Sequence, residues 1–401
     1  MEGLTSQGRD TIPRVTHVSY FYSVLEGIAT GQCFDELRLR LRQLGNELSR
    51  RSGGNASTAR IADSYTFWSP TADSISELMR LGLVERRPLP SKRVNVDAHR
   101  DATYALTLPG QLIIEQSRGS ESLFRGALTP LLINQHPYLS TLRRVLAEEP
   151  LLIPEYTEDE LKEFKQAGDS WTRELGEDAA NRMKRSMSLA KVSSESVTTQ
   201  IRESLGRRFS GGAEPTAKDI LDTAADALIV ATLEARQVRY DAITFNILMS
   251  WGRQLFIFDE SRYVHGMPGR TIWSTADVEG PEQHERVTRR GLSRYGDQVA
   301  QQLATAYREI ADAIATDGGA PGSLYPYLEI FKVRALAAFR LKVNVSLVDR
   351  VIAEIADRDR TAPFRLELQL GMANWPSSEA PFRLGSRRYY VILIKPEGDE
   401  L

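Results

Sequence analysis

The side chains best suited to catalysis are three carboxylates near the end of the chain, Asp357, Asp359 and Glu367. Carboxylates that converge at a strand can hold a divalent metal ion for nuclease chemistry, and a nearby lysine then stabilises the developing charge. Gln369 occupies the position after Glu367 where such enzymes commonly carry that lysine. The sequence therefore gives little support to a metal-dependent nuclease, and we expect neither a bound metal nor a cofactor.

A second group of chemistry-bearing residues lies in the segment 258–266, which contains Asp259, Glu260, Arg262 and His265. These residue types together can form a catalytic site. Charged residues that are so close in sequence more often form local ion pairs in a turn. We therefore interpret this segment as structural.

The other common catalytic signatures are absent from the sequence. None of the five histidines has the spacing of a metal-ligand pair, and Cys33 is the single cysteine. A cysteine-built zinc site and an intramolecular disulfide are thus excluded. The sequence also has neither a glycine-rich phosphate-binding loop nor the Gly-x-Ser-x-Gly turn of many hydrolases. We predict a protein that is not an enzyme.

Composition and charge are those of a globular protein with no general attraction for polyanions. The 401 residues are 41% hydrophobic and 26% charged, and the formal net charge is -2. A chain of this length is expected to fold as two or three domains. Since the whole molecule is nearly neutral, contact with nucleic acid would require a local cationic surface.

The segment 57–116 has the most informative pattern of secondary structure. Its predicted elements are helices over 57–65 and 69–81, strands over 83–87 and 103–107, and a helix from 108. Ser69 is the expected N-cap of the second helix, with Pro70 at its first position, and Gly82 ends that helix. A polar loop with several basic residues, 88–101, joins the two strands into a hairpin.

The runs LGLVERR (81–87) and YALTLPGQ (104–111), with the basic loop between them, resemble the winged helix-turn-helix of MarR- and PadR-type bacterial regulators. In those families a recognition helix ends in a Leu-x-x-Gly-Leu-Val turn, and a basic wing is followed by Leu-Thr-x-x-Gly. The resemblance covers residues 57–116, and it extends back to about residue 19 if the preceding helices belong to the same domain. It implies a domain that holds double-stranded DNA.

In such a domain the second helix lies in the major groove, and the hairpin contacts phosphates or the minor groove. The helix offers short polar side chains, whereas Asp73 would repel a phosphate. The cations come from the hairpin and its neighbours. The expected DNA-binding residues are Ser69, Thr71, Ser74, Arg86, Arg87, Lys92, Arg93, Arg100 and Arg60.

The rest of the chain has helical periodicity until its last part. Apolar residues recur on one helical face over 219–237, 299–313 and 328–341. Phe364–Leu370 alternates as a half-buried strand does, and Tyr389–Ile394 is a continuous β-prone run. We predict a mainly α protein with a winged helix over 1–118, a helical domain over 119–360 and a small β element over 361–401.

The leading hypothesis is a non-enzymatic DNA-binding protein, either a regulator or the DNA-binding subunit of a multi-protein system. Its helical region would mediate homo-oligomerisation or bind a partner protein. The alternative is that the winged helix is a docking module that touches no DNA. The N-terminus lacks the apolar run of a signal peptide, and the most apolar helical stretch, 224–233, is too short to span a bilayer. We therefore expect a cytoplasmic protein without membrane contact.

Overall fold

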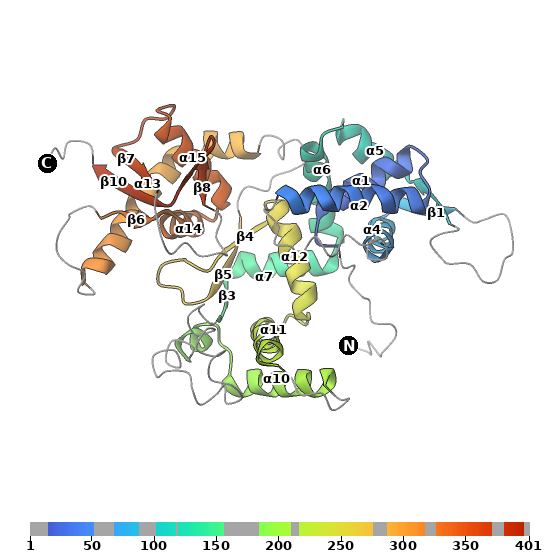
Figure 1. The fold of residues 1–401 in the computed structure, drawn as a ribbon, viewed down its shortest axis with the longest axis horizontal. Coiled ribbons are helices and arrows are strands. Elements are labelled where there is room, and N and C mark those ends of the chain that lie inside the picture. Colours follow the sequence, from blue (N-terminus) through green and yellow to red (C-terminus); the bar gives the residue numbers. More distant parts are fainter. Residues whose placement is uncertain are drawn as a thin grey trace. The chain divides into compact units, whose positions relative to one another are not determined.

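The computed structural model describes residues 15–51, 68–87, 102–117, 119–155, 184–209, 216–275, 287–316, 326–370 and 381–396. The fold is mainly helical, as predicted, and it also contains a few small antiparallel sheets (Figure 1). Its described residues form two compact units. Unit 1 comprises those up to Ser140 together with Asn246–Leu255, and unit 2 comprises the others.

This division differs from the three parts predicted from the sequence. The first unit extends beyond residue 118 because α6 (Glu121–Gln135) packs against α1 (Val18–Ala29) and α5 (Leu108–Ser117). It also takes in the second half of α12 (Ala242–Gln254), where the indole N–H of Trp251 donates to the carbonyl of Val15 at 2.6 Å. A contact between residues so distant in the sequence leaves no local pattern that would predict it.

Unit 1 is a helical domain that carries one β-hairpin. Besides α1, α5 and α6, its elements are α2 (Phe34–Arg51), α4 (Trp68–Arg80), β1 (Val84–Arg87), β2 (Thr103–Leu106) and the start of α7 (Pro137–Glu148). Helix α1 is the centre of the unit and contacts α2, α4, α5 and α6. Its apolar side chains, such as Phe21 and Leu25, are fully buried.

The turn after α4 fixes where the hairpin begins. Gly82 has a φ of 68°, a left-handed conformation that glycine adopts without a steric penalty. The N–H of Leu83 donates to the carbonyl of Leu78 at 2.9 Å and closes the end of the helix. Strand β1 then pairs antiparallel with β2, from Val84 opposite Leu106 to Arg87 opposite Thr103. The predicted order of helix, hairpin and helix over 69–117 is therefore present, although α4 starts at Trp68 and Ser69 is a helical residue rather than the N-cap.

Unit 2 contains most of the predicted helical region and the C-terminal strands. Its helices are α10 (Ser194–Arg208), α11 (Ala217–Ala235), α13 (Val287–Thr316), α14 (Ile330–Leu341) and α15 (Val345–Ala356). The predicted apolar stripe of α13 is confirmed by the complete burial of Val299, Leu303 and Ala306. The stripe of α11 is confirmed by its buried Ala224, Ala227, Leu228 and Ala231.

One sheet of unit 2 was not predicted. It has the strand order β3-β5-β4 and consists of Leu151–Ile153, Arg270–Ser274 and Phe258–Ser261. Strand β3 has only three residues, and its partner lies far along the chain. A strand so short has no detectable alternation. The sequence therefore predicts only helices over 119–360, where this sheet lies.

The C-terminal strands are not a separate element. Strands β7 (Phe364–Gln369) and β10 (Val391–Pro396) pair along their whole length, and β6 (Leu328–Glu329) joins the other edge of β10. Phe364 and Ile392 from this sheet share one hydrophobic core with α13, α14 and α15. A second hairpin, β8 (Phe382–Leu384) with β9 (Arg387–Tyr389), contributes Phe382 to the same core.

Candidate functional site

The side chains of α4 that were expected to read DNA do not face solvent. Thr71 and Ser74 are both fully buried, and the Ser74 hydroxyl donates to the carbonyl of Pro70 at 2.6 Å. Thr71 lies four residues before the buried Ile75, and Ser74 lies four residues before the buried Leu78, so all four side chains lie on the same helical face. The expectation that Thr71 and Ser74 contact DNA is therefore wrong. The side chain of Ser69 lies outside the described residues.

The outward face of α4 is nearly neutral. Its exposed side chains are Ser76, Met79 and Arg80, and Asp73 is half-buried. The Arg80 guanidinium is bonded to the carboxylate of Glu77, with Nε 3.2 Å from Oε1. Along its described length, this helix therefore offers no cation that is not already neutralised.

The exposed cations of this region lie on the hairpin instead. Arg86 and Arg87 on β1 are exposed, and they lie opposite Tyr104 and Thr103 on β2. Burial raises the pKa of the Tyr104 phenol, while the positive charge of Arg86 opposes that increase. Within the described residues, neither arginine forms an ion pair, although the neighbouring Glu85 is also exposed. The remaining expected cations, Lys92, Arg93, Arg100 and Arg60, lie outside the described residues.

Helix α4 is held in place by a buried polar cluster that the sequence did not indicate. The side chains of Glu77 and His136 expose 1% and 0% of their surfaces, and His136 Nε2 lies 3.3 Å from Glu77 Oε1. Arg80 reaches the same pair from the protein surface, with a guanidinium nitrogen 2.8 Å from His136 Nε2. His136 is the residue between α6 and α7, so the cluster joins α4 to the junction of those two helices.

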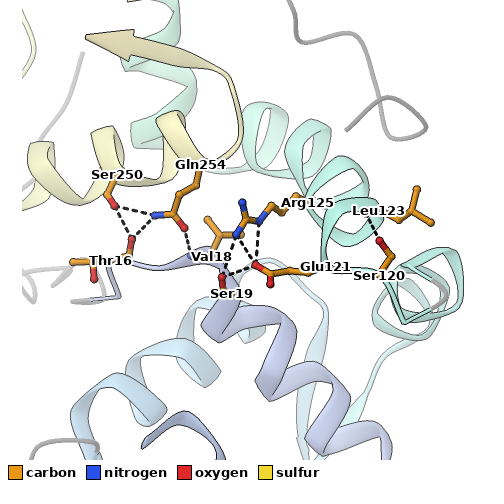
Figure 2. A network of polar contacts seen from close by, with 9 residues as sticks. All are labelled: Thr16, Val18, Ser19, Ser120, Glu121, Leu123, Arg125, Ser250 and Gln254. Atoms are coloured by element: carbon orange, nitrogen blue, oxygen red, sulfur yellow. Dashed lines mark hydrogen bonds and ion pairs between the residues drawn. The ribbon is translucent and has the colours of Figure 1, made fainter. Parts of the chain in front are cut away.

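A second polar network joins α1, α6 and α12 within unit 1 (Figure 2). The Ser19 hydroxyl donates to Glu121 Oε1 at 2.5 Å, and Arg125 Nε donates to the same oxygen at 3.1 Å. On the other side of α1, the backbone N–H of Val18 donates to Gln254 Oε1 at 3.0 Å. These bonds fix the start of α1, the helix on which the rest of the unit packs.

The same network shifts two pKa values. Burial raises the pKa of Glu121, but the hydrogen bond from Ser19 and the charge of Arg125 together outweigh burial and leave the pKa below its usual value. The pKa of His17 is lowered, first by burial and then by the positive charge of Arg125. His17 thus resists protonation in the folded protein.

A cleft of about 580 Å³ lies along α1 and α2 and differs in charge from the hairpin. Four carboxylates line it, from Glu26, Glu36, Glu47 and Glu121, against the single guanidinium of Arg40. Arg40 is already paired with Glu26, and its Nε donates to the Ser23 hydroxyl at 2.9 Å. Burial and the nearby carboxylate of Glu26 raise the pKa of Tyr22 to about 12. This acidic cleft would repel a phosphate backbone.

The charged segment 258–266 has a structural role. Asp259 is buried, and its Oδ2 accepts a hydrogen bond of 2.7 Å from the backbone N–H of Val345 at the start of α15. Glu260 pairs with Arg270 on the adjacent strand, with Nε 2.6 Å from Oε2, and Arg262 pairs with Glu155 at 2.8 Å. Ion pairs form, but their partners lie outside the segment, so the expectation of local pairs within a turn is wrong.

The carboxylates considered for nuclease chemistry do not assemble into a metal site. Asp357 and Asp359 are exposed, whereas Glu367 accepts a hydrogen bond from the Tyr327 hydroxyl at 3.1 Å and lies 3.8 Å from the amine of Lys395. In the part of the chain that the structure describes, no group of three or more histidine, cysteine or carboxylate side chains is placed to hold a metal ion. The nuclease alternative thus loses its candidate residues.

Comparison with known proteins does not assign the chain to a family. It matches no protein-family model, and no curated protein or solved structure is significantly similar to it. Among the described helices, none combines the length and the apolar character needed to cross a lipid bilayer. The geometry of unit 1 is therefore the main guide to function.

Proposed function

We propose that this protein binds double-stranded DNA through unit 1, which acts as a winged helix with the β1–β2 hairpin as its main contact. It does so without enzymatic chemistry, as a regulator or as the DNA-binding subunit of a larger assembly. The observation that carries the proposal is the exposure of Arg86 and Arg87 on the hairpin that directly follows α4. The sequence continues from Arg87 into a segment that contains Lys92, Arg93 and Arg100.

The proposed contact is mainly with the DNA backbone. Guanidinium groups match the geometry of phosphate oxygens, and such contacts position a protein without reading sequence. Base readout needs exposed donors and acceptors on the helix in the groove. Because Thr71 and Ser74 are buried and Asp73 is acidic, α4 contributes little of this kind. We therefore expect binding that depends strongly on salt and only weakly on DNA sequence.

The test is a titration of duplex DNA by fluorescence anisotropy over a salt series between about 50 and 200 mM. Each phosphate contact contributes about 0.9 to the slope of log K against log salt. The Arg86→Gln/Arg87→Gln variant should lower that slope by about 1.8 and weaken binding roughly tenfold at low salt. Arg143→Gln/Arg144→Gln removes two adjacent exposed arginines from α7 and is the matched control. An unchanged slope in the Arg86 and Arg87 variant would refute the proposal.

The second candidate function is protein docking through unit 1. Helix α5 exposes 69% of Leu108 and 46% of Leu112, two apolar side chains one turn apart. A docking surface of this kind would bind a partner with little dependence on salt, in contrast to a phosphate contact. Leu108→Ser/Leu112→Ser should then abolish association with a partner and leave DNA affinity unchanged. Wild-type protein that fails to bind duplex DNA at low salt would favour this function.

A further inference from the structure

A second arginine-bearing hairpin lies in unit 2, formed by β8 and β9. Its residues pair as Phe382 with Tyr389, Arg383 with Arg388 and Leu384 with Arg387. Gly385 in the turn has a φ of 59°, which suits a two-residue hairpin connection. The sequence 381–396 contains four basic residues, Arg383, Arg387, Arg388 and Lys395, and no acidic residue.

One face of this hairpin is anchored and the other is open to solvent. Phe382 exposes only 2% of its surface, and Leu384 and Tyr389 pack against the same core. Successive side chains of a strand point to opposite faces, so Arg383 and Arg388 lie on the face away from that core. Both are exposed. Arg387 is exposed beside the turn, but it pairs with Leu384 and so lies on the opposite face of the hairpin. Because one face packs against the core, the hairpin keeps Arg383 and Arg388 in fixed positions on its open face.

The pairing places two positive charges, those of Arg383 and Arg388, directly opposite each other with no carboxylate of the described residues bonded to either. Directly opposite residues of an antiparallel pair have Cβ atoms about 5 Å apart, and like charges there are destabilising. Within the described residues, none of the three arginine side chains has an ion pair or a hydrogen bond. By contrast, Lys395 and Arg365 on the neighbouring sheet both lie within 4 Å of the Glu367 carboxylate, at 3.8 and 3.7 Å. An external anion would relieve the repulsion between Arg383 and Arg388.

We propose that the β8–β9 hairpin is a second contact for the phosphates of duplex DNA, separate from the β1–β2 hairpin. This inference rests on the proposed function, because it assigns the same ligand to another surface of the chain. Arginine forms bidentate bonds to phosphate, and the facing pair Arg383 and Arg388 can engage neighbouring phosphates of one backbone. A lipid surface fits less well, because the described residues of the hairpin include no exposed large apolar side chain that could insert.

The experiment compares full-length variants by fluorescence anisotropy with duplex DNA over a salt series. Arg383→Gln/Arg388→Gln should lower the slope of log K against log salt by about 1.8 and weaken binding about tenfold at low salt. The control with equal loss of charge is Arg308→Gln/Arg350→Gln, which removes one exposed arginine from each of α13 and α15. It should leave the slope unchanged. An equal loss in the control would overturn the proposal, because general charge would then explain the effect.

A single variant separates DNA binding from folding. Arg388→Glu places a carboxylate opposite Arg383 and replaces repulsion with attraction across the hairpin. The melting temperature should stay the same or rise while DNA affinity falls. A melting temperature that is maintained together with unchanged DNA affinity would overturn the proposal.

The two hairpins can be judged independently in the same assay. If the β8–β9 variants bind as wild type does while Arg86→Gln/Arg87→Gln weakens binding, the second contact is refuted and the proposed function stands. If only the β8–β9 variants weaken binding, the second contact is supported and the role of β1–β2 is refuted. Loss of binding to anionic vesicles, with DNA binding unchanged, would assign the hairpin to a membrane surface and overturn the proposal.

Discussion

The ring nitrogen Nδ1 of His136 accepts a hydrogen bond from the backbone N–H of Leu139 at 3.2 Å. The ring therefore satisfies a donor in the first turn of α7, as an N-cap side chain does. The other ring nitrogen, Nε2, lies 3.3 Å from the buried carboxylate of Glu77 and 2.8 Å from the guanidinium of Arg80. One side chain thus caps α7 and provides a partner for α4.

Replacing this ring should destabilise unit 1. In His136→Ala the buried Glu77 loses its imidazole neighbour, and the N–H of Leu139 loses its acceptor. A cavity also forms beside Trp251, which packs edge-on against the ring. We expect the free energy of unfolding to fall by about 2–4 kcal/mol, which urea denaturation would measure. His265→Ala removes a half-exposed histidine and should cost far less. Equal losses in the two variants would contradict the role assigned to His136.

Gly110 is required by the close approach of α5 to the start of β1. A Cβ atom at this position would lie 2.1 Å from the carbonyl oxygen of Leu83, which is backbone and cannot rotate away. Gly110→Ala should therefore lower the free energy of unfolding by more than about 2 kcal/mol and displace the hairpin. Gly206 on α10 has no neighbour within 4 Å, so Gly206→Ala should stabilise the protein by about 0.5–1 kcal/mol. Thermal unfolding of the two variants should shift in opposite directions, and a shift in the same direction would refute the packing argument.

The elements of the hairpin region could be predicted because their signals are local. Gly82 ends a helix, and two short strand-like runs on either side of the basic loop pair with each other. The burial of Thr71 and Ser74 could also be predicted from the sequence, because their spacing from Ile75 and Leu78 puts all four residues on one helical face. Residue type alone suggests DNA contact at these positions, whereas the spacing predicts burial.

The parts that escaped prediction depend on contacts between distant segments. Glu77 has no local sign that it meets His136, and Trp251 has none that it bonds to Val15. Strand β3 is defined by pairing with β5 rather than by its own composition. Tertiary contacts, not propensity, decide such features.

Stability should fall as the pH drops below neutral because of His17. Burial and the charge of Arg125 lower the pKa of His17 in the folded protein, so the unfolded chain binds this proton more tightly. The contribution of His17 is fully present above the ordinary value of 6.5 and is lost as the pH falls through the lowered value. Urea denaturation at pH 8 and at about pH 5.5 should show the loss. His17→Gln should lose less stability between the two pH values than wild type, and an equal loss would contradict this assignment.

Asp259 shows how the structural role of the segment 258–266 can be tested against a catalytic one. Its Oδ2 accepts from Val345 and its Oδ1 accepts from the N–H of Glu260 at 2.8 Å, so the carboxylate joins β4 to the start of α15. A negative charge at a helix N-terminus is further stabilised by the helix dipole. Asp259→Ala leaves both donors unsatisfied and should reduce the free energy of unfolding by about 2–4 kcal/mol, whereas Asp259→Asn keeps one acceptor and should lose about half as much. Because this carboxylate acts only on folding, the DNA affinity of the folded Asp259→Asn variant should equal that of wild type. If Asp259→Asn lost DNA affinity without losing stability, the structural role would be contradicted and the segment 258–266 would again be a candidate functional site.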